Sequence, residues 1–204
     1  MLFQGKREAT ILRVLEAALG VFLVANAGTS AAGRSPVLLP AELARAANPG
    51  IDSTCQAVLD ASEKLFATPY HMYSTQGGAI VGNGQPKSSE AVFAGGALYI
   101  LYNGKWSPSP ISIDEMKAME QRNRNNVKNM SCHYVRDEAV NGESAALYST
   151  HEETVHGKTD SQTWVSKSKG LVLRQEIDID TGGANAKTHI SSRYEYSNVQ
   201  APKP

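Results

Sequence analysis

From residue 70 onward, apolar and polar positions alternate in short segments separated by turn residues. A period of two is typical of strands, and the breaks rich in Gly and Asn favour tight hairpins between consecutive antiparallel strands. In 171–180, Leu171, Leu173, Ile177 and Ile179 fall on one predicted face, and charged residues fall on the other. We therefore expect a sheet with one dry face and one wet face. The predicted strands are 70–76, 79–81, 89–93, 98–102, 132–138, 145–155, 163–166, 171–180 and 187–199.

Two segments instead repeat their apolar residues at intervals of three or four, which predicts helices. In the first, Ser53 and Gln56 have the spacing of a capping box, and Pro69 ends the run. In the second, Ser112 and Glu115 have the same spacing. This second helix interrupts the strands, and we expect it to lie across the sheet with its methionine side inward. Its apolar stripe opens with Ile113, Met116 and Met119.

Residues 1–32 have the layout of a secretory signal peptide. Basic residues precede an apolar run at 17–25, and small residues follow it. Small side chains place the predicted cleavage near 27–32, after Ala27, Ala31 or Ala32. The alternative is an amphipathic N-terminal helix, which Glu8 and Glu16 favour because a carboxylate beside the apolar run opposes membrane insertion.

Domain organisation follows from the segments that remain. Residues 33–50, rich in Ala and Pro, are predicted to be a flexible lead-in. Residues 51–200 are predicted to form a single β-rich domain, and 201–204 a short tail. No apolar stretch approaches the roughly 20 residues that span a bilayer, so no integral membrane span is expected after signal cleavage.

Charge narrows the classes of partner. The 204-residue chain has 20 basic and 20 acidic residues and a formal net charge of zero. A protein that binds duplex nucleic acid needs an excess of basic residues to neutralise phosphates, so no nucleic-acid partner is expected.

Cys55 and Cys132 are the only cysteines. In an exported domain, an isolated pair is usually a disulfide, so we predict a Cys55–Cys132 bridge in a periplasmic or secreted protein. A metal site would need more soft ligands, and the pair does not have the Cys-x-x-Cys spacing of a redox motif.

Two segments look like local catalytic or metal-binding motifs, but neither has the spacing that such a motif needs. His151 and His156 are five residues apart, whereas a zinc-protease helix needs a step of four to place both imidazoles on one face. The acidic segment at 178–183 has Gly182 at its fifth position, where a calcium loop needs a ligand. No nucleophile elbow, phosphate loop or dinucleotide fingerprint is present. We therefore expect no enzyme, no metal and no cofactor; a hydrolase with a dispersed site stays an alternative.

Large flexible and aromatic side chains indicate a different role. A curled sheet with a helix over its mouth encloses a space, and methionine and aromatic rings suit an adaptable lipophilic pocket. The alternative is that these residues fill the core. The predicted cavity-wall residues are Trp106, Met116, Met119 and Trp164.

The C-terminal third resembles a known family. Trp164 precedes a Lys-rich turn that ends in Gly170, then Leu171 and Arg174, and the closing segment 193–199 ends in an aromatic–Asn–Val pattern. The pair of segments at 134–155, with Asn141-Gly142-Glu143 at its turn, fits the strands before this hairpin. These features resemble the periplasmic lipoprotein-carrier superfamily: LolA-like carriers, mycobacterial lipid-binding lipoproteins and the sensor domain of RseB-like regulators.

This resemblance implies an α+β fold in which a strongly curved antiparallel sheet, an unclosed β-barrel, has its concave face covered by the N-terminal and inserted helices. It also implies binding of a lipid, an acyl chain or an envelope protein. The leading hypothesis is therefore a non-enzymatic periplasmic binder of a lipophilic ligand or a lipidated or envelope partner. The alternatives are an interaction or envelope-stress sensor module without a small ligand, and the dispersed hydrolase.

Overall fold

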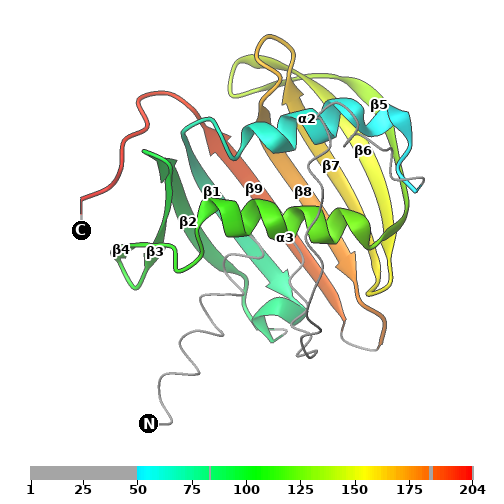
Figure 1. Cartoon of the computed structure of the whole chain (residues 1–204), viewed down its shortest axis with the longest axis horizontal. Coiled ribbons are helices and arrows are strands. Elements are labelled where there is room, and N and C mark those ends of the chain that lie inside the picture. Colours follow the sequence, from blue (N-terminus) through cyan, green and yellow to red (C-terminus); the bar gives the residue numbers. More distant parts are fainter. Residues whose placement is uncertain (1–49, 83, 184–185, 204) are drawn as a thin grey trace, which may run out of the picture.

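The computed structural model describes residues 50–82, 84–183 and 186–203. In this part of the chain, nine strands form one antiparallel sheet in the order β4-β3-β2-β1-β9-β8-β7-β6-β5 (Figure 1). β4 and β5 are the two edges and do not pair with each other, so the sheet is an unclosed barrel. The strands are β1 (Tyr70–Gly78), β2 (Lys87–Ala94), β3 (Ala97–Tyr102), β4 (Lys105–Pro108), β5 (Val127–Val140), β6 (Glu143–Thr154), β7 (Lys158–Ser166), β8 (Val172–Asp180) and β9 (Lys187–Glu195).

Two helices lie on the same face of the curved sheet (Figure 1). The short turn η1 (Ser53–Cys55) leads into α2 (Gln56–Lys64), and α3 (Ile113–Asn125) crosses the strands between β4 and β5 in the sequence. Ala61 and Leu65 near the end of α2 and Met116 of α3 join one core cluster with Tyr70 and Phe93 of the sheet. The predicted α+β fold, with an unclosed curved sheet and helices on its concave face, is confirmed.

The starts of the two helices differ in whether the predicted capping box is present. Ser112 and Glu115 form the predicted capping box at the start of α3, with both reciprocal hydrogen bonds present. The predicted box at Ser53 and Gln56 is wrong. Asp52 caps the short η1 turn instead, because its carboxylate accepts a hydrogen bond from the Thr54 backbone N–H at 2.9 Å.

Several strand boundaries differ from the prediction. The predicted strand at 79–81 is a 3-10 turn, η2 (Ala79–Val81), flanked by Gly78 and Gly82 with φ of 78° and 69°. A left-handed backbone on both sides ends the pairing, and glycine adopts it without strain. β4 was not predicted, and β5 and β7 begin at Val127 and Lys158, several residues earlier than expected.

The predicted dry face of 171–180 is divided between clusters. Ile177 and Ile179 are buried and pack with Ile190 of β9. Between β7 and β8 the register shifts at Trp164 and Val165. As a result, Val172 packs in the core under the helices, whereas Leu173 packs with Trp164 in a separate cluster.

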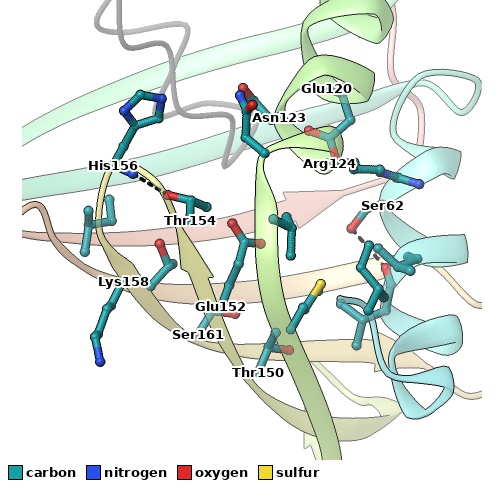
Figure 2. A pocket seen from close by; sticks show the side chains of 18 of the residues that line it. Ser62, Glu120, Asn123, Arg124, Thr150, Glu152, Thr154, His156, Lys158 and Ser161 are labelled. Carbon is teal, nitrogen blue, oxygen red and sulfur yellow. Dashed lines mark hydrogen bonds and ion pairs between the residues drawn. The ribbon is translucent and has the colours of Figure 1, made fainter. Parts of the chain in front are cut away.

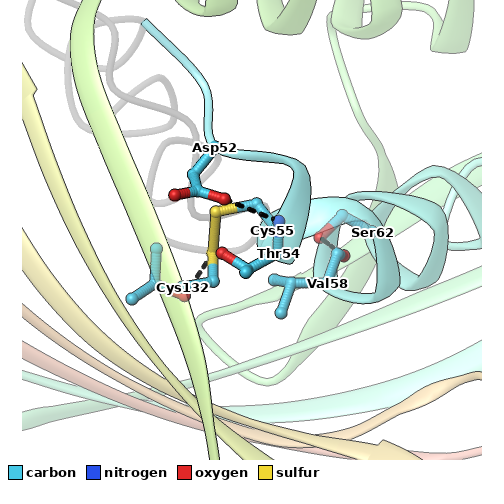
Figure 3. Close-up of a disulfide and its surroundings, with 7 residues drawn as sticks. Asp52, Thr54, Cys55, Val58, Ser62 and Cys132 are labelled. Carbon is cyan, nitrogen blue, oxygen red and sulfur yellow. Dashed lines mark hydrogen bonds between the residues drawn. A yellow bond between two sulfur atoms is a disulfide. The ribbon is translucent and has the colours of Figure 1, made fainter.

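The predicted disulfide between Cys55 and Cys132 is present and joins η1 to edge strand β5, with 4.9 Å between the two Cα atoms (Figure 3). Both cysteines are buried. Beside them, Ile51 forms a bridge with Met130, and the Asp52 backbone N–H donates to the Met130 carbonyl at 2.9 Å. The start of α2 is therefore held on β5 by covalent and hydrogen bonds.

Replacing both cysteines with alanine is expected to lower the free energy of unfolding by about 2–5 kcal/mol, because the unfolded chain regains the freedom that a bridge of sequence separation 77 removes. Urea denaturation of the wild type and the double variant measures the difference. The wild type in reductant is the matched control and should lose a similar amount, while the alanine variant should not respond to reductant. A loss below about 1 kcal/mol would show that the bridge contributes little.

Candidate functional site

A cavity of about 150 Å³ lies between α2, the C-terminal end of α3 and the inner face of β5 to β8 (Figure 2). Its position follows from the way the two helices cover the sheet. Ala61 of α2 and Met116 in the first part of α3 pack in the main core over β1 to β3, whereas another side of α2 and the last turns of α3 lie over the other half of the sheet. The cavity occupies this second half.

One end of the cavity is apolar. On α2, Val58 and Leu59 recur with Leu65 and Phe66 just beyond its end, at the spacing that puts them on one side of a helix. The opposing wall comes from β5, where Val127 and Met130 face the helix. Four more residues also line the cavity: the bridge residue Ile51, Gly157 in the turn between β6 and β7, and Gln175 and Ile179 of β8.

The other end is polar. Thr150, Glu152 and Thr154 alternate along β6, so all three face the helices from the inner side of the sheet. The last turns of α3 add Glu120 and Asn123 from above. Figure 2 shows Glu152 in the middle of this end, below Asn123. The remaining polar lining residues are Ser62, Arg124, Asn126, His156, Lys158, Thr159, Ser161 and Thr181.

Arg124 is already engaged by acidic groups at this end. Its guanidinium is 3.1 Å from Glu120 on its own helix and 3.0 Å from Glu63 on α2. These contacts connect α3 to α2 above the cavity. The carboxylates of Glu120 and Glu63, and not that of Glu152, therefore neutralise much of the positive charge of Arg124.

Glu152 has no such partner. Within the described residues it accepts no hydrogen bond and forms no ion pair. Burial, and then repulsion from Glu120, raise the pKa of its carboxyl above the usual value of 4.5. The inner end of the cavity therefore holds a carboxylate whose charged form is destabilised by its surroundings.

Asn123 supplies the complementary group. Among the described residues, its buried Nδ2 has no hydrogen-bond partner. A buried donor without a partner costs about 1–3 kcal/mol. The polar end thus combines an acceptor, Glu152, with an unsatisfied donor, the Asn123 amide.

The four residues predicted from the sequence to form a cavity wall lie elsewhere in the fold. Met116 and Met119 are buried on the inner side of α3, where they seat the helix that carries Glu120. Trp164 is 4% exposed, and the Arg174 guanidinium covers its ring at 4.7 Å on the face away from the helices. Trp106 on β4 packs in a T-shaped arrangement with the His71 ring, with 5.9 Å between the ring centroids. None of the four lines this cavity.

The residues that do line it gave a weak signal in the sequence. His151-Glu152-Glu153-Thr154 reads as an acidic strand end, and only the pairing of β6 with β7 decides that Glu152 and Thr154 turn inward while His151 and Glu153 turn outward. His151 then bonds Asp160 at 2.7 Å across the outer face. The alternation was visible in the sequence; its direction was not.

Among the described residues, the side chains of His71, His151 and His189 hydrogen-bond to carboxylates, and His71 also contacts the Tyr73 hydroxyl. No group of three or more His, Cys, Asp or Glu residues in the described part of the chain is arranged to hold a metal ion. No described helix is long and apolar enough to cross a membrane.

No family model matches the chain, and no curated protein matches its sequence. Among solved structures, it is similar to the lipoprotein LppX of Mycobacterium tuberculosis, with 13% identity over 72% of this chain and 96% of that chain and a TM-score of 0.42. LprF of Mycobacterium bovis matches with 11% identity over 76% and 99% and a TM-score of 0.41. MucB, in its complex with MucA(peri), matches with 11% identity over 74% of this chain and 57% of that one, again at 0.41.

At such identities and TM-scores the likeness carries nothing about ligand or activity. Function therefore has to come from the chain's own cavity.

Glu152→Gln is expected to raise the free energy of unfolding at neutral pH by about 0.5–2 kcal/mol. The raised pKa means that the folded chain holds this proton more tightly than the unfolded chain. Ionisation above the folded pKa therefore destabilises the wild type, and glutamine avoids that cost. The gain should fade as the pH falls through the raised pKa and be absent below about 4, where both states are protonated.

Urea denaturation at several pH values measures this difference. Glu153→Gln is the matched control, because Glu153 is the next residue on the same strand but faces outward and pairs with Lys158 at 2.7 Å. Loss of that exposed ion pair should cost about 0–1 kcal/mol. If Glu152→Gln destabilised the protein at neutral pH, Glu152 would have a stabilising partner after all.

Proposed function

We propose that this protein is a non-enzymatic binding protein of the periplasm or the extracellular space, and that its cavity takes the apolar part of a lipophilic ligand or of a lipidated partner. The observation that carries the proposal is the apolar end of the cavity. There, Val58, Leu59 and Phe66 of the α2 region stand opposite Val127 and Met130 without filling the space between them. An open volume with apolar walls gains free energy by taking up an apolar group, at about 25 cal/mol per Å² removed from water.

The volume limits what can be enclosed. At about 150 Å³, the cavity is smaller than the roughly 300–1,000 Å³ of sites that enclose a whole small molecule. We infer that a segment of an acyl chain enters and that the rest of the ligand stays at the mouth. A lipidated partner fits this arrangement as well as a free lipid does.

The compartment is supported by the disulfide. Stable bridges between lone cysteine pairs form in oxidising surroundings and are rare in the bacterial or eukaryotic cytosol. The Cys55–Cys132 bridge holds the start of α2, which supplies one wall of the cavity. The signal peptide predicted at 1–32 lies outside the described residues and accords with the same compartment.

Ser62→Phe is expected to weaken the binding of an apolar probe. Ser62 lies on α2 at the rim of the apolar end, and a phenyl ring at this position occupies the space that a chain segment would use. The neutral fluorophore N-phenyl-naphthylamine, titrated and then displaced with decanol, provides the readout. We expect saturable binding to the wild type and at least about a ten-fold loss in Ser62→Phe, which corresponds to about 1.4 kcal/mol.

Ser62→Ala is the matched control at the same position. It removes only the hydroxyl that donates to the Val58 carbonyl at 2.9 Å, and alanine is a better helix former than serine. Its probe binding should stay within about three-fold of the wild type. If the wild type and Ser62→Ala bind no probe, the apolar-ligand proposal is wrong, and the interaction or sensor module becomes the leading candidate.

A further inference from the structure

The polar end of the cavity has an excess of negative charge. Glu152 and Glu120 face it from β6 and α3. The arginine and the lysine at the same end are both held by acids: Arg124 by Glu120 and Glu63, and Lys158 by Glu153 at 2.7 Å. An anionic head group would meet two carboxylates here, of which one has no counter-charge of its own.

We propose that the ligand is a cationic amphiphile, whose apolar chain lies between α2 and β5 and whose ammonium group is held by the carboxylate of Glu152. This inference rests on the proposed function, because the chain must first enter the cavity. It adds the chemical class of the head group and the residue that recognises it.

The geometry supports this assignment in two ways. Apolar and polar residues line the same cavity, and Met130 of β5 is the register partner of Glu152 on β6, so a molecule with its chain against Met130 has its head near Glu152. An ionised carboxylate is also an acceptor only, and a charged donor makes the strongest hydrogen bond with it. A bound ammonium would offset both the burial of Glu152 and its repulsion from Glu120.

The Asn123 amide extends the recognition. Its unsatisfied Nδ2 lies at the same end and needs an acceptor. An ammonium compound with a hydroxyl or carbonyl oxygen beside the nitrogen would satisfy Glu152 and Asn123 together. A metal ion is a poorer fit, since no group of three possible ligands is arranged to hold one among the residues described.

Three probes with the same chain and different heads test the inference: decylamine, decanol and decanoate. Each displaces N-phenyl-naphthylamine from the full exported chain at neutral pH, below the concentration at which the probe forms micelles. We expect decylamine to bind at least about ten-fold more tightly than decanol, which is the size of one charge-assisted hydrogen bond, and decanoate to bind most weakly.

Glu152→Gln should remove the preference for the amine and leave decanol affinity within about three-fold, because the apolar end is unchanged. Glu153→Gln carries the same change of charge on the outer face and should keep the preference. These two variants separate a local contact with Glu152 from the general electrostatic field of the protein.

The outcomes distinguish this inference from the proposed function. Equal binding of the three probes, tighter binding of decanoate, or an unchanged amine preference in Glu152→Gln would overturn the cationic-head assignment while apolar binding stood. Absence of binding by all three would overturn both. The comparison among the three probes uses the wild type alone, so it decides the matter even if Glu152→Gln folds poorly.

Discussion

The attachment of helix α2 to edge strand β5 is the constraint on which the cavity depends. The Cys55–Cys132 bridge fixes the start of the helix, and the Lys64 ammonium donates to the Lys169 carbonyl at 2.9 Å near its end. Between these points, Glu63 contacts Arg124 of α3. A nine-residue helix is too short to be stable alone, so its position over the sheet comes from these tertiary links and from the apolar side that it buries.

Because α2 is held at both ends, the inner face of the sheet is covered unevenly. Over β1 to β3, large side chains such as Tyr70 and Phe93 fill the space under the helices. Over the second half of β6, the inward positions are instead Thr150, Glu152 and Thr154, which are shorter or polar. The helices cannot collapse onto this half without breaking their links, so an open volume remains where the sheet becomes polar.

The sequence was informative wherever a structure is encoded locally. The Ser112–Glu115 capping box, the alternation of the strands and the pairing of two lone cysteines each need only near neighbours or composition. Prediction from the sequence failed where the strand register decides which side chains face the helices. The shift at Trp164 and Val165 puts Trp164 under Arg174 on the outer face, and no local pattern records which way a strand faces. The cavity is lined by residues from two helices and four strands, so no local sequence motif encodes any of its walls.

The polar inner face of β6 is hard to explain by folding alone. A sheet that is covered by helices gains stability from apolar inward residues, and an inward carboxylate without a partner opposes folding. Glu152 is such a carboxylate, next to an unsatisfied Asn123 amide and below an Arg124 that is occupied by other acids. Sites that violate the rules of stable packing in several ways at one place are typical of binding surfaces, where the missing partner is the ligand. The same side chains that weaken this half of the domain therefore define the chemistry of what it binds.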